Sequence, residues 1–224
     1  MISIYSLFFL ILFFSQNFTY AHRYDIVIKG GHIIDPKNNI NGVRDIAISN
    51  GKIATVAADI STKEAAQVVA ARDLYIAPGL TDIHVHVFYG NHTEQYLMDA
   101  TSVIVPDGFT FRTGVTTIVG AGSPGWRIFP QFKKQEIERS HTRVLAFLNI
   151  VGAGMSGATY EQEEDGMDPQ KAAGMANAHK ESIVGFKVAH FEAAKWTPVD
   201  NAVSAGKLSG LPVMIDFGGD DNHI

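Results

Sequence analysis

The stretch PGLTDIHVH, residues 78–86, divides the chain into two parts with different sequence patterns. Before it, residues 22–78 contain short runs of apolar residues, several of them alternating with polar ones, separated by turn-forming pairs such as Asn50-Gly51. An Asn-Gly pair favours a two-residue hairpin turn, because both residues tolerate positive φ angles. We therefore expect residues 22–78 to form a small all-β domain.

After Gly79, near-continuous apolar runs alternate with helical stretches. The runs predict strands at residues 83–88, 115–119, 144–151, 183–189 and 212–217, and helices are expected over residues 129–143, 169–182 and 198–208. Apolar strands separated by helices are typical of a parallel sheet that is covered by helices. The pattern therefore predicts an α/β domain over residues 79–224, either an open doubly wound sheet or a closed barrel.

The composition excludes several classes of function. The 224 residues carry a formal net charge of −5 and contain no long run of Lys or Arg, so nucleic acid is not an expected partner. There is no cysteine, which excludes disulfides, a thiolate zinc site and a cysteine nucleophile.

Residues 1–21 resemble a secretory signal peptide. They carry no charged side chain, they contain an unbroken apolar run from Leu7 to Phe14, and the small residue Ala21 ends the segment at the expected cleavage site. The alternative is a membrane anchor, but a spanning helix needs about 20 apolar residues and this run is much shorter. We therefore expect export to the periplasm or the medium, without stable membrane association after cleavage.

The pattern GxGxxG occurs twice, at residues 120–125 and 152–157, each time after a predicted strand. A dinucleotide site requires such a loop to lead directly into a helix. Pro124 disturbs that geometry in the first copy, and a polar stretch follows the second. A dinucleotide-dependent oxidoreductase is therefore the weaker alternative, and glycine-rich loops also suit the mouth of a barrel.

His84 and His86 are the main candidates for chemistry. Side chains alternate between the two faces of a strand, so these two imidazoles are expected on the same face, together with Asp82. Two imidazole nitrogens directed at one point suit a zinc-like cation. The alternative is a pair of ordinary core or surface histidines.

Three stretches carry a resemblance to a known family: DIVIKGGHIIDP (residues 25–36), DIAISNGKIATV (residues 45–56) and IAPGLTDIHVH (residues 76–86). Together they resemble the amidohydrolase superfamily and, more narrowly, the amidohydrolase/deacetylase metallohydrolases related to dihydroorotase. The resemblance implies a (β/α)8 TIM barrel preceded by a small β-sandwich domain, of which residues 22–78 are the N-terminal part. It also implies one or two divalent metal ions, with zinc the expected identity.

The resemblance implies that His84, His86 and Lys187 are metal ligands, with Lys187 carbamylated by carbon dioxide. A lysine within an apolar strand agrees with this, because burial favours the neutral amine that takes up carbon dioxide; the alternative is a lysine whose head reaches water at the strand end. Asp216 stands where the family usually has a histidine, and either a ligand or a non-metal role is expected for it. His190 is expected either to line the site or to lie at the surface.

The activity implied by the resemblance is hydrolysis of an amide C–N bond through a metal-activated water. The expected partner is a small amide, either an N-acetylated compound or a cyclic amide, and a homo-oligomer is compatible with the sequence. Three further barrel strands and the general base are expected beyond residue 224, so we expect the chain to be C-terminally truncated. The alternative function is therefore a catalytically inactive metal-binding fragment.

Overall fold

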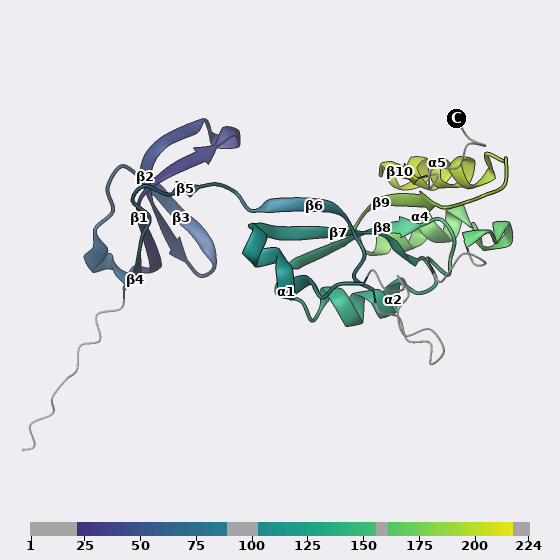
Figure 1. The fold of residues 1–224 in the computed structure, drawn as a ribbon, viewed down its shortest axis with the longest axis horizontal. Coiled ribbons are helices and arrows are strands. Elements are labelled where there is room, and N and C mark those ends of the chain that lie inside the picture. Colours follow the sequence, from purple (N-terminus) through teal and green to yellow (C-terminus); the bar gives the residue numbers. More distant parts are fainter. Residues whose placement is uncertain (1–21, 89–102, 156–160, 217–224) are drawn as a thin grey trace, which may run out of the picture. The chain divides into compact units, whose positions relative to one another are not determined.

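The structure, a computed structural model, describes residues 22–88, 103–155 and 161–216. The signal segment expected over residues 1–21 lies outside these ranges, as does the end of the last expected strand, Phe217. The chain divides between Pro78 and Gly79 into two compact units, which are described separately below (Figure 1).

The first unit contains one five-stranded sheet with the order β3-β2-β1-β4, in which β5 also pairs with β1. Its elements are β1 (Tyr24–Asp35), η1 (Pro36–Asn38), β2 (Ile40–Ser49), β3 (Lys52–Ala57), η2 (Thr62–Glu64), β4 (Ala65–Ala70) and β5 (Tyr75–Ile76). Asn50 and Gly51 form the hairpin turn between β2 and β3, both with positive φ, as predicted. β1 continues through the Gly30-Gly31 pair, because a bulge with Gly30 at φ 71° keeps the strand intact there.

The second unit contains a five-stranded parallel sheet with the order β10-β9-β8-β7-β6. Its strands are β6 (Leu80–Val85), β7 (Val115–Gly125), β8 (Arg143–Asn149), β9 (Ile183–Ala189) and β10 (Val213–Asp216). Each strand pairs in parallel with the next one along the chain, whereas a doubly wound sheet reverses its strand order at a switch point. The curled sheet is therefore part of a (β/α) barrel, and this confirms the predicted fold class.

Helices join these strands. They are α1 (Pro106–Phe109), η4 (Thr110–Thr113), α2 (Phe129–Phe132), the π-helical turn η5 (Lys133–Ile137), η6 (Glu164–Gly166), α4 (Pro169–Ala178) and α5 (Thr197–Ser209). α4 begins where expected, because the Asp168 carboxylate accepts the backbone N–H groups of Gln170 and Lys171. The helix expected over residues 129–143 is shorter, since Arg143 already belongs to β8. None of the helices in the described ranges is long and apolar enough to cross a membrane.

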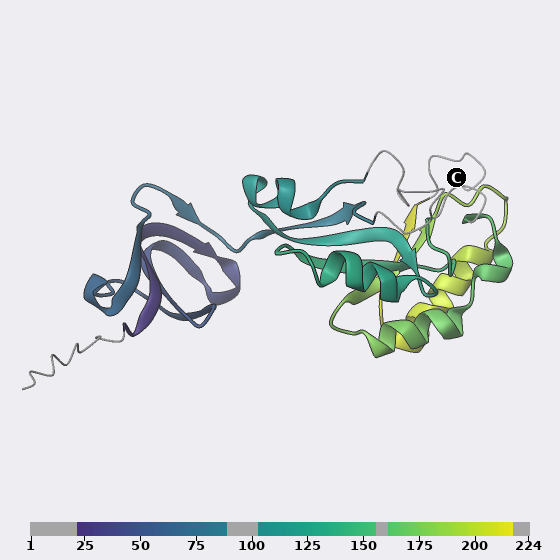
Figure 2. The ribbon, with the colours of Figure 1, turned by 90° about the horizontal axis from the view of Figure 1, so that it is seen from below.

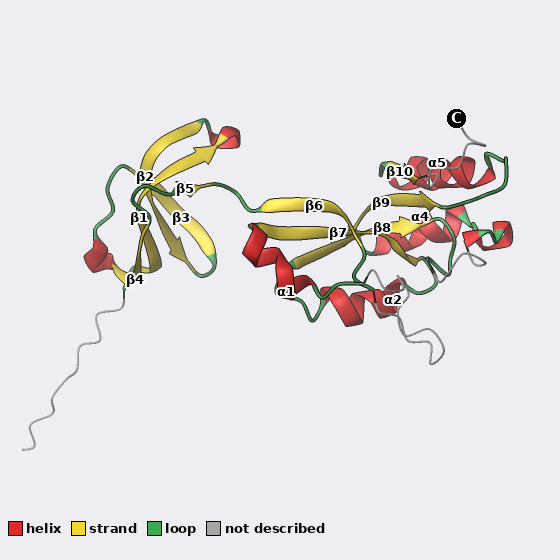
Figure 3. Ribbon diagram, in the orientation of Figure 1, coloured by secondary structure: helices red, strands yellow, loops and turns green. Residues whose placement is uncertain are grey.

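The packing of the second unit fixes the strand ends. α4 and α5 contact each other and lie on one side of the parallel sheet (Figures 2 and 3). Beneath the strands is a continuous apolar core in which the Phe88 and Phe132 rings meet edge to face at 5.3 Å. Phe129, Leu148 and Phe186 are fully buried in the same core. The side chains at the carboxyl ends of the strands therefore project from a rigid base.

Candidate metal centre

His84 and His86 lie at the end of β6, and their rings are close together. The ring centroids are 5.5 Å apart with an interplanar angle of 69°. His86 stands one residue beyond the last strand residue, Val85, while the backbone N–H of His84 donates to the Asp82 carboxylate at 3.0 Å. His84 is exposed and His86 is half-buried. The structure thus places the two predicted imidazoles side by side. The Asp82 carboxylate accepts the backbone N–H of His84.

The charges around His84 favour its neutral form. Partial desolvation of the ring lowers the pKa of His84 below its ordinary value of 6.5, and the positive charge of Lys187 and then His86 lowers it further. Asp216 and Asp82 act in the opposite direction without reversing the shift. His84 therefore lies within electrostatic range of both Lys187 and Asp216. The neutral imidazole is also the form that binds metal ions.

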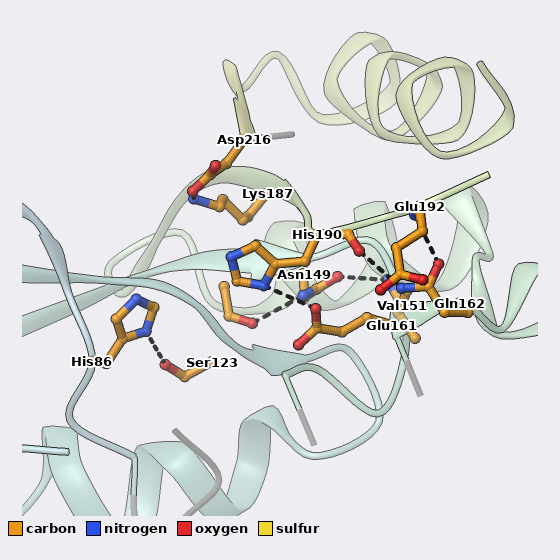
Figure 4. Close-up of polar contacts among 11 residues, drawn as sticks. His86, Ser123, Asn149, Val151, Glu161, Gln162, Lys187, His190, Glu192 and Asp216 are labelled. Atoms are coloured by element: carbon orange, nitrogen blue, oxygen red, sulfur yellow. Dashed lines mark hydrogen bonds and ion pairs between the residues drawn. The ribbon is translucent and has the colours of Figure 1, made fainter. Parts of the chain in front are cut away.

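The structure places Ser123 beside His86. Ser123 is a fully buried residue of β7, and its hydroxyl Oγ lies 3.4 Å from His86 Nδ1. Figure 4 shows this contact, which holds the His86 ring through Nδ1. The sequence contained no signal for this serine, since its relation to His86 depends on the pairing of β6 with β7.

Lys187 of β9 is buried, with only 1% of its side chain exposed. Its Nζ lies 3.0 Å from Asp216 Oδ2 and 3.7 Å from the Met214 sulfur, both on the neighbouring strand β10. The Asp216 side chain is 31% exposed, so the ion pair has a buried cation and a more open carboxylate (Figure 4). The structure thus brings the predicted residues Lys187 and Asp216 into direct contact.

Gly122 and Asn149 shape the pocket around the Lys187 stem. Gly122 has φ 88°, and a Cβ atom there would lie 2.5 Å from Lys187 Cγ. The Asn149 amide donates to the Gly122 carbonyl at 3.1 Å and accepts the Val151 N–H at 3.0 Å. The glycines at residues 120–125 belong to strand β7, so this copy of GxGxxG does not lead directly into a helix. In this copy the glycine at 122 makes room for the lysine.

His190 follows β9 and faces Glu161. Its Nδ1 lies 3.0 Å from Glu161 Oε2, and its backbone N–H donates to the Asp216 carbonyl at 3.2 Å. Among residues 22–88, 103–155 and 161–216, no three His, Asp or Glu side chains gather closely enough to hold a metal ion by themselves. His84, His86 and Asp216 therefore do not form a metal site on their own within these ranges.

The chain is similar in sequence to known hydrolases, although no family model matches it. A deacetylase of Agrobacterium fabrum is 32% identical over an alignment of 184 residues that covers 78% of this chain and 43% of the relative. A dihydroorotase of Elusimicrobium minutum is 39% identical over 85 residues, which are 38% of this chain and 19% of the relative.

Two solved structures share the fold. An adenine deaminase matches with a TM-score of 0.71 at 26% identity, covering 86% of this chain and 50% of that chain. A dihydroorotase matches with a TM-score of 0.69 at 25% identity, covering 88% of this chain and 52% of that chain. The chain thus spans 43% of the deacetylase and about half of each solved structure.

Proposed function

Because the chain belongs to the amidohydrolase superfamily, we propose that it carries the first metal ligands of a hydrolase that cleaves amide C–N bonds in small molecules with the help of a divalent cation. The relatives named deacetylase and dihydroorotase support two substrate types, N-acetylated compounds and cyclic amides. Zinc is the proposed cation, since two imidazoles contribute to the donor set.

One observation carries this proposal: a buried lysine, Lys187, that pairs with Asp216 and whose charge reaches His84. The donor set fits a divalent cation. His84 and His86 offer imidazole nitrogens and Asp216 offers a carboxylate oxygen, all of which zinc accepts. The Lys187 ammonium is not a donor, but its carbamate would present two oxygens at the same place.

Carbamylation of Lys187 would also change its relation to Asp216. The Lys187 ammonium first loses one proton. The neutral amine then attacks carbon dioxide, an N–C bond forms as one C=O π bond opens, and a second proton is released, so that a cationic side chain becomes anionic. The ion pair of 3.0 Å would then become a pair of like charges. Two neighbouring anions need a cation between them, and this is why lysine carbamylation and cation binding are proposed to occur together.

The remaining residues of the site hold these donors in place. Partial desolvation, the largest cause of the lowered pKa of His84, favours its neutral ring whatever the charge of Lys187. Ser123 orients the His86 ring, and Gly122 makes room for the Lys187 stem. When bound, a divalent cation polarises the substrate carbonyl and makes hydroxide available near neutral pH. The chain's own residues thus orient the ligands before any substrate arrives.

The experiment measures zinc binding by calorimetry, together with zinc-dependent hydrolysis of N-acetylated amino acids and hydantoins, for the full chain supplied with bicarbonate. We expect His84→Ala to lose zinc binding. The matched control is His179→Ala, which removes a histidine near the amino end of β9 whose ring packs on Phe129. If both variants bind zinc as the unchanged chain does, the proposed metal centre is wrong.

A further inference from the structure

His190 has an unusual backbone conformation at the carboxyl end of β9. Its φ angle is 50°, in the left-handed region that non-glycine residues seldom adopt. Residues held in this region are found preferentially at functional sites, where the surrounding structure keeps them in place. His190 lies three residues after Lys187 and its backbone contacts Asp216, so it belongs to the edge of the candidate metal centre.

Hydrogen bonds hold both the backbone N–H and the backbone carbonyl of His190. Its N–H donates to the Asp216 carbonyl at 3.2 Å, and its carbonyl accepts from the Gln162 amide nitrogen at 2.8 Å. The Gln162 carbonyl oxygen in turn accepts the Glu192 N–H at 2.9 Å. One glutamine side chain thus clamps the turn that follows β9 and fixes the direction of the imidazole.

The ring itself is held by a buried carboxylate. His190 Nδ1 meets Glu161 Oε2 at 3.0 Å, and only 5% of the Glu161 side chain is exposed while 45% of the His190 side chain is. A buried carboxylate is held rigidly by its surroundings, so its contact with Nδ1 holds the imidazole in one orientation.

In Figure 4 the other nitrogen, Nε2, lies on the side of the His190 ring away from Glu161, and 45% of the His190 side chain is exposed. In Figure 4 the His190 ring is drawn between His86 and Glu161, below the Lys187–Asp216 pair. An imidazole nitrogen accepts a hydrogen bond in the neutral ring and donates one when it carries a proton. An amide offers both an N–H and a carbonyl, so it can pair with either form.

We propose that His190 binds the amide group of the substrate through Nε2, and that Glu161 and Gln162 are positioning residues that hold its ring. This inference rests on the proposed hydrolase function, and it names the residue that would recognise the amide. It assigns His190 to the substrate and leaves the cation to His84, His86, Lys187 and Asp216.

The test measures binding of two probes, N-acetylglycine and hydantoin, to the full chain with and without zinc, by NMR of the histidine side chains. His190→Asn keeps an amide nitrogen near the position of Nδ1 but removes Nε2, and we expect it to weaken probe binding about tenfold, the effect of one lost hydrogen bond. His190→Gln places an amide group near the position of Nε2 and should recover part of the binding. Glu161→Gln should weaken binding less than His190→Asn does, and His179→Asn should not change it.

The outcomes separate this inference from the proposed metal centre. A chain that binds zinc through His84 but binds neither probe overturns the role of His190 and leaves the metal centre standing. Probe binding that depends on His190 without any zinc binding supports the role of His190 and overturns the metal centre. Equal probe affinity of the unchanged chain and His190→Asn, with both folded, overturns the inference directly.

Discussion

Each unit of the molecule pairs a strand lysine with an aspartate on the neighbouring strand, and the two pairs are built in opposite ways. In the first unit, Lys29 of β1 is partly exposed and contacts the buried Asp45 of β2 and the exposed Asp59. In the second unit, Lys187 of β9 is buried and Asp216 of β10 is the more open partner. The cation is thus solvated in one pair and enclosed in the other.

The comparison distinguishes a lysine–aspartate pair that stabilises the fold, Lys29–Asp45, from a pair at the candidate metal centre, Lys187–Asp216. Asp45 accepts the backbone N–H groups of Gly30 and Ile60, each at 2.8 Å, in addition to the Lys29 ammonium. It therefore ties three segments of the first unit together. Lys187 instead contacts the Asp216 carboxylate and the Met214 sulfur. Its charge also lowers the pKa of His84, so a change in the charge of Lys187 would act on both Asp216 and His84.

The largest expected effect comes from Lys187→Met. We expect zinc-dependent hydrolysis to fall by about 100-fold or more. Mutation of residues that only orient a metal ligand already lowers metal affinity or activity about 10–100-fold, and Lys187 is a proposed ligand itself. Stability should stay within about 1 kcal/mol, because Met fills the buried space of the lysine stem and the remaining carboxylate, Asp216, is 31% exposed and can be solvated by water. Uptake of labelled bicarbonate, hydrolysis rates and urea unfolding measure these effects. Lys29→Met is the matched control, and it should leave hydrolysis unchanged.

Gly122→Ala tests how closely Lys187 is enclosed. The new Cβ would lie 2.5 Å from Lys187 Cγ at a residue with φ 88°, so strain and overpacking together should cost about 3 kcal/mol. Gly174→Ala in α4 is the control, since the space around it is open, and it should stabilise by about 0.5–1 kcal/mol. Thermal unfolding compares the two variants, and equal melting temperatures would contradict the tight enclosure of Lys187.

Asp45→Ala tests the structural pair. It leaves the Gly30 and Ile60 N–H groups without their carboxylate, and we expect a loss of about 2 kcal/mol from the first unit. Asp59→Ala removes an exposed carboxylate and should cost less than about 1 kcal/mol. Zinc binding should be the same in both variants. A loss of zinc binding in Asp45→Ala would show that the two pairs do not have separate roles.

The smallest expected effect is the pH dependence that Asp45 gives to the first unit. Burial acts to raise the pKa of Asp45, but hydrogen bonds from Lys29, Gly30 and Ile60 outweigh it and hold the pKa below its ordinary value of 3.8. Its contribution to stability is therefore present above about pH 4 and is lost as the pH falls through the lowered pKa. Urea unfolding at acidic pH should show this loss, and Asp45→Asn should abolish it.

Several features of this fold could be predicted from the sequence because they depend on near neighbours. Asn50-Gly51 encodes its own turn, Asp168 and Pro169 encode the start of α4, and the apolar runs encode strands, of which β7, β8 and β9 are largely buried. The alternation of these runs with helices predicted a parallel sheet but left an open doubly wound sheet and a closed barrel as alternatives. The spacing of His84 and His86 likewise brings their rings together, since residues two apart in a strand share a face.

The tertiary structure alone decided which distant groups meet. Lys187 reaches Asp216, and His190 reaches Glu161, each across 29 residues of chain, because neighbouring parallel strands and the loops that follow them converge at one edge of the sheet. The same convergence places Ser123 beside His86. It also brings the Lys187 stem so close to residue 122 that only a glycine, which has no Cβ, leaves room for it. Local sequence preferences act over a few residues, whereas these contacts depend on strand register and twist, which are set by the packing of the whole core.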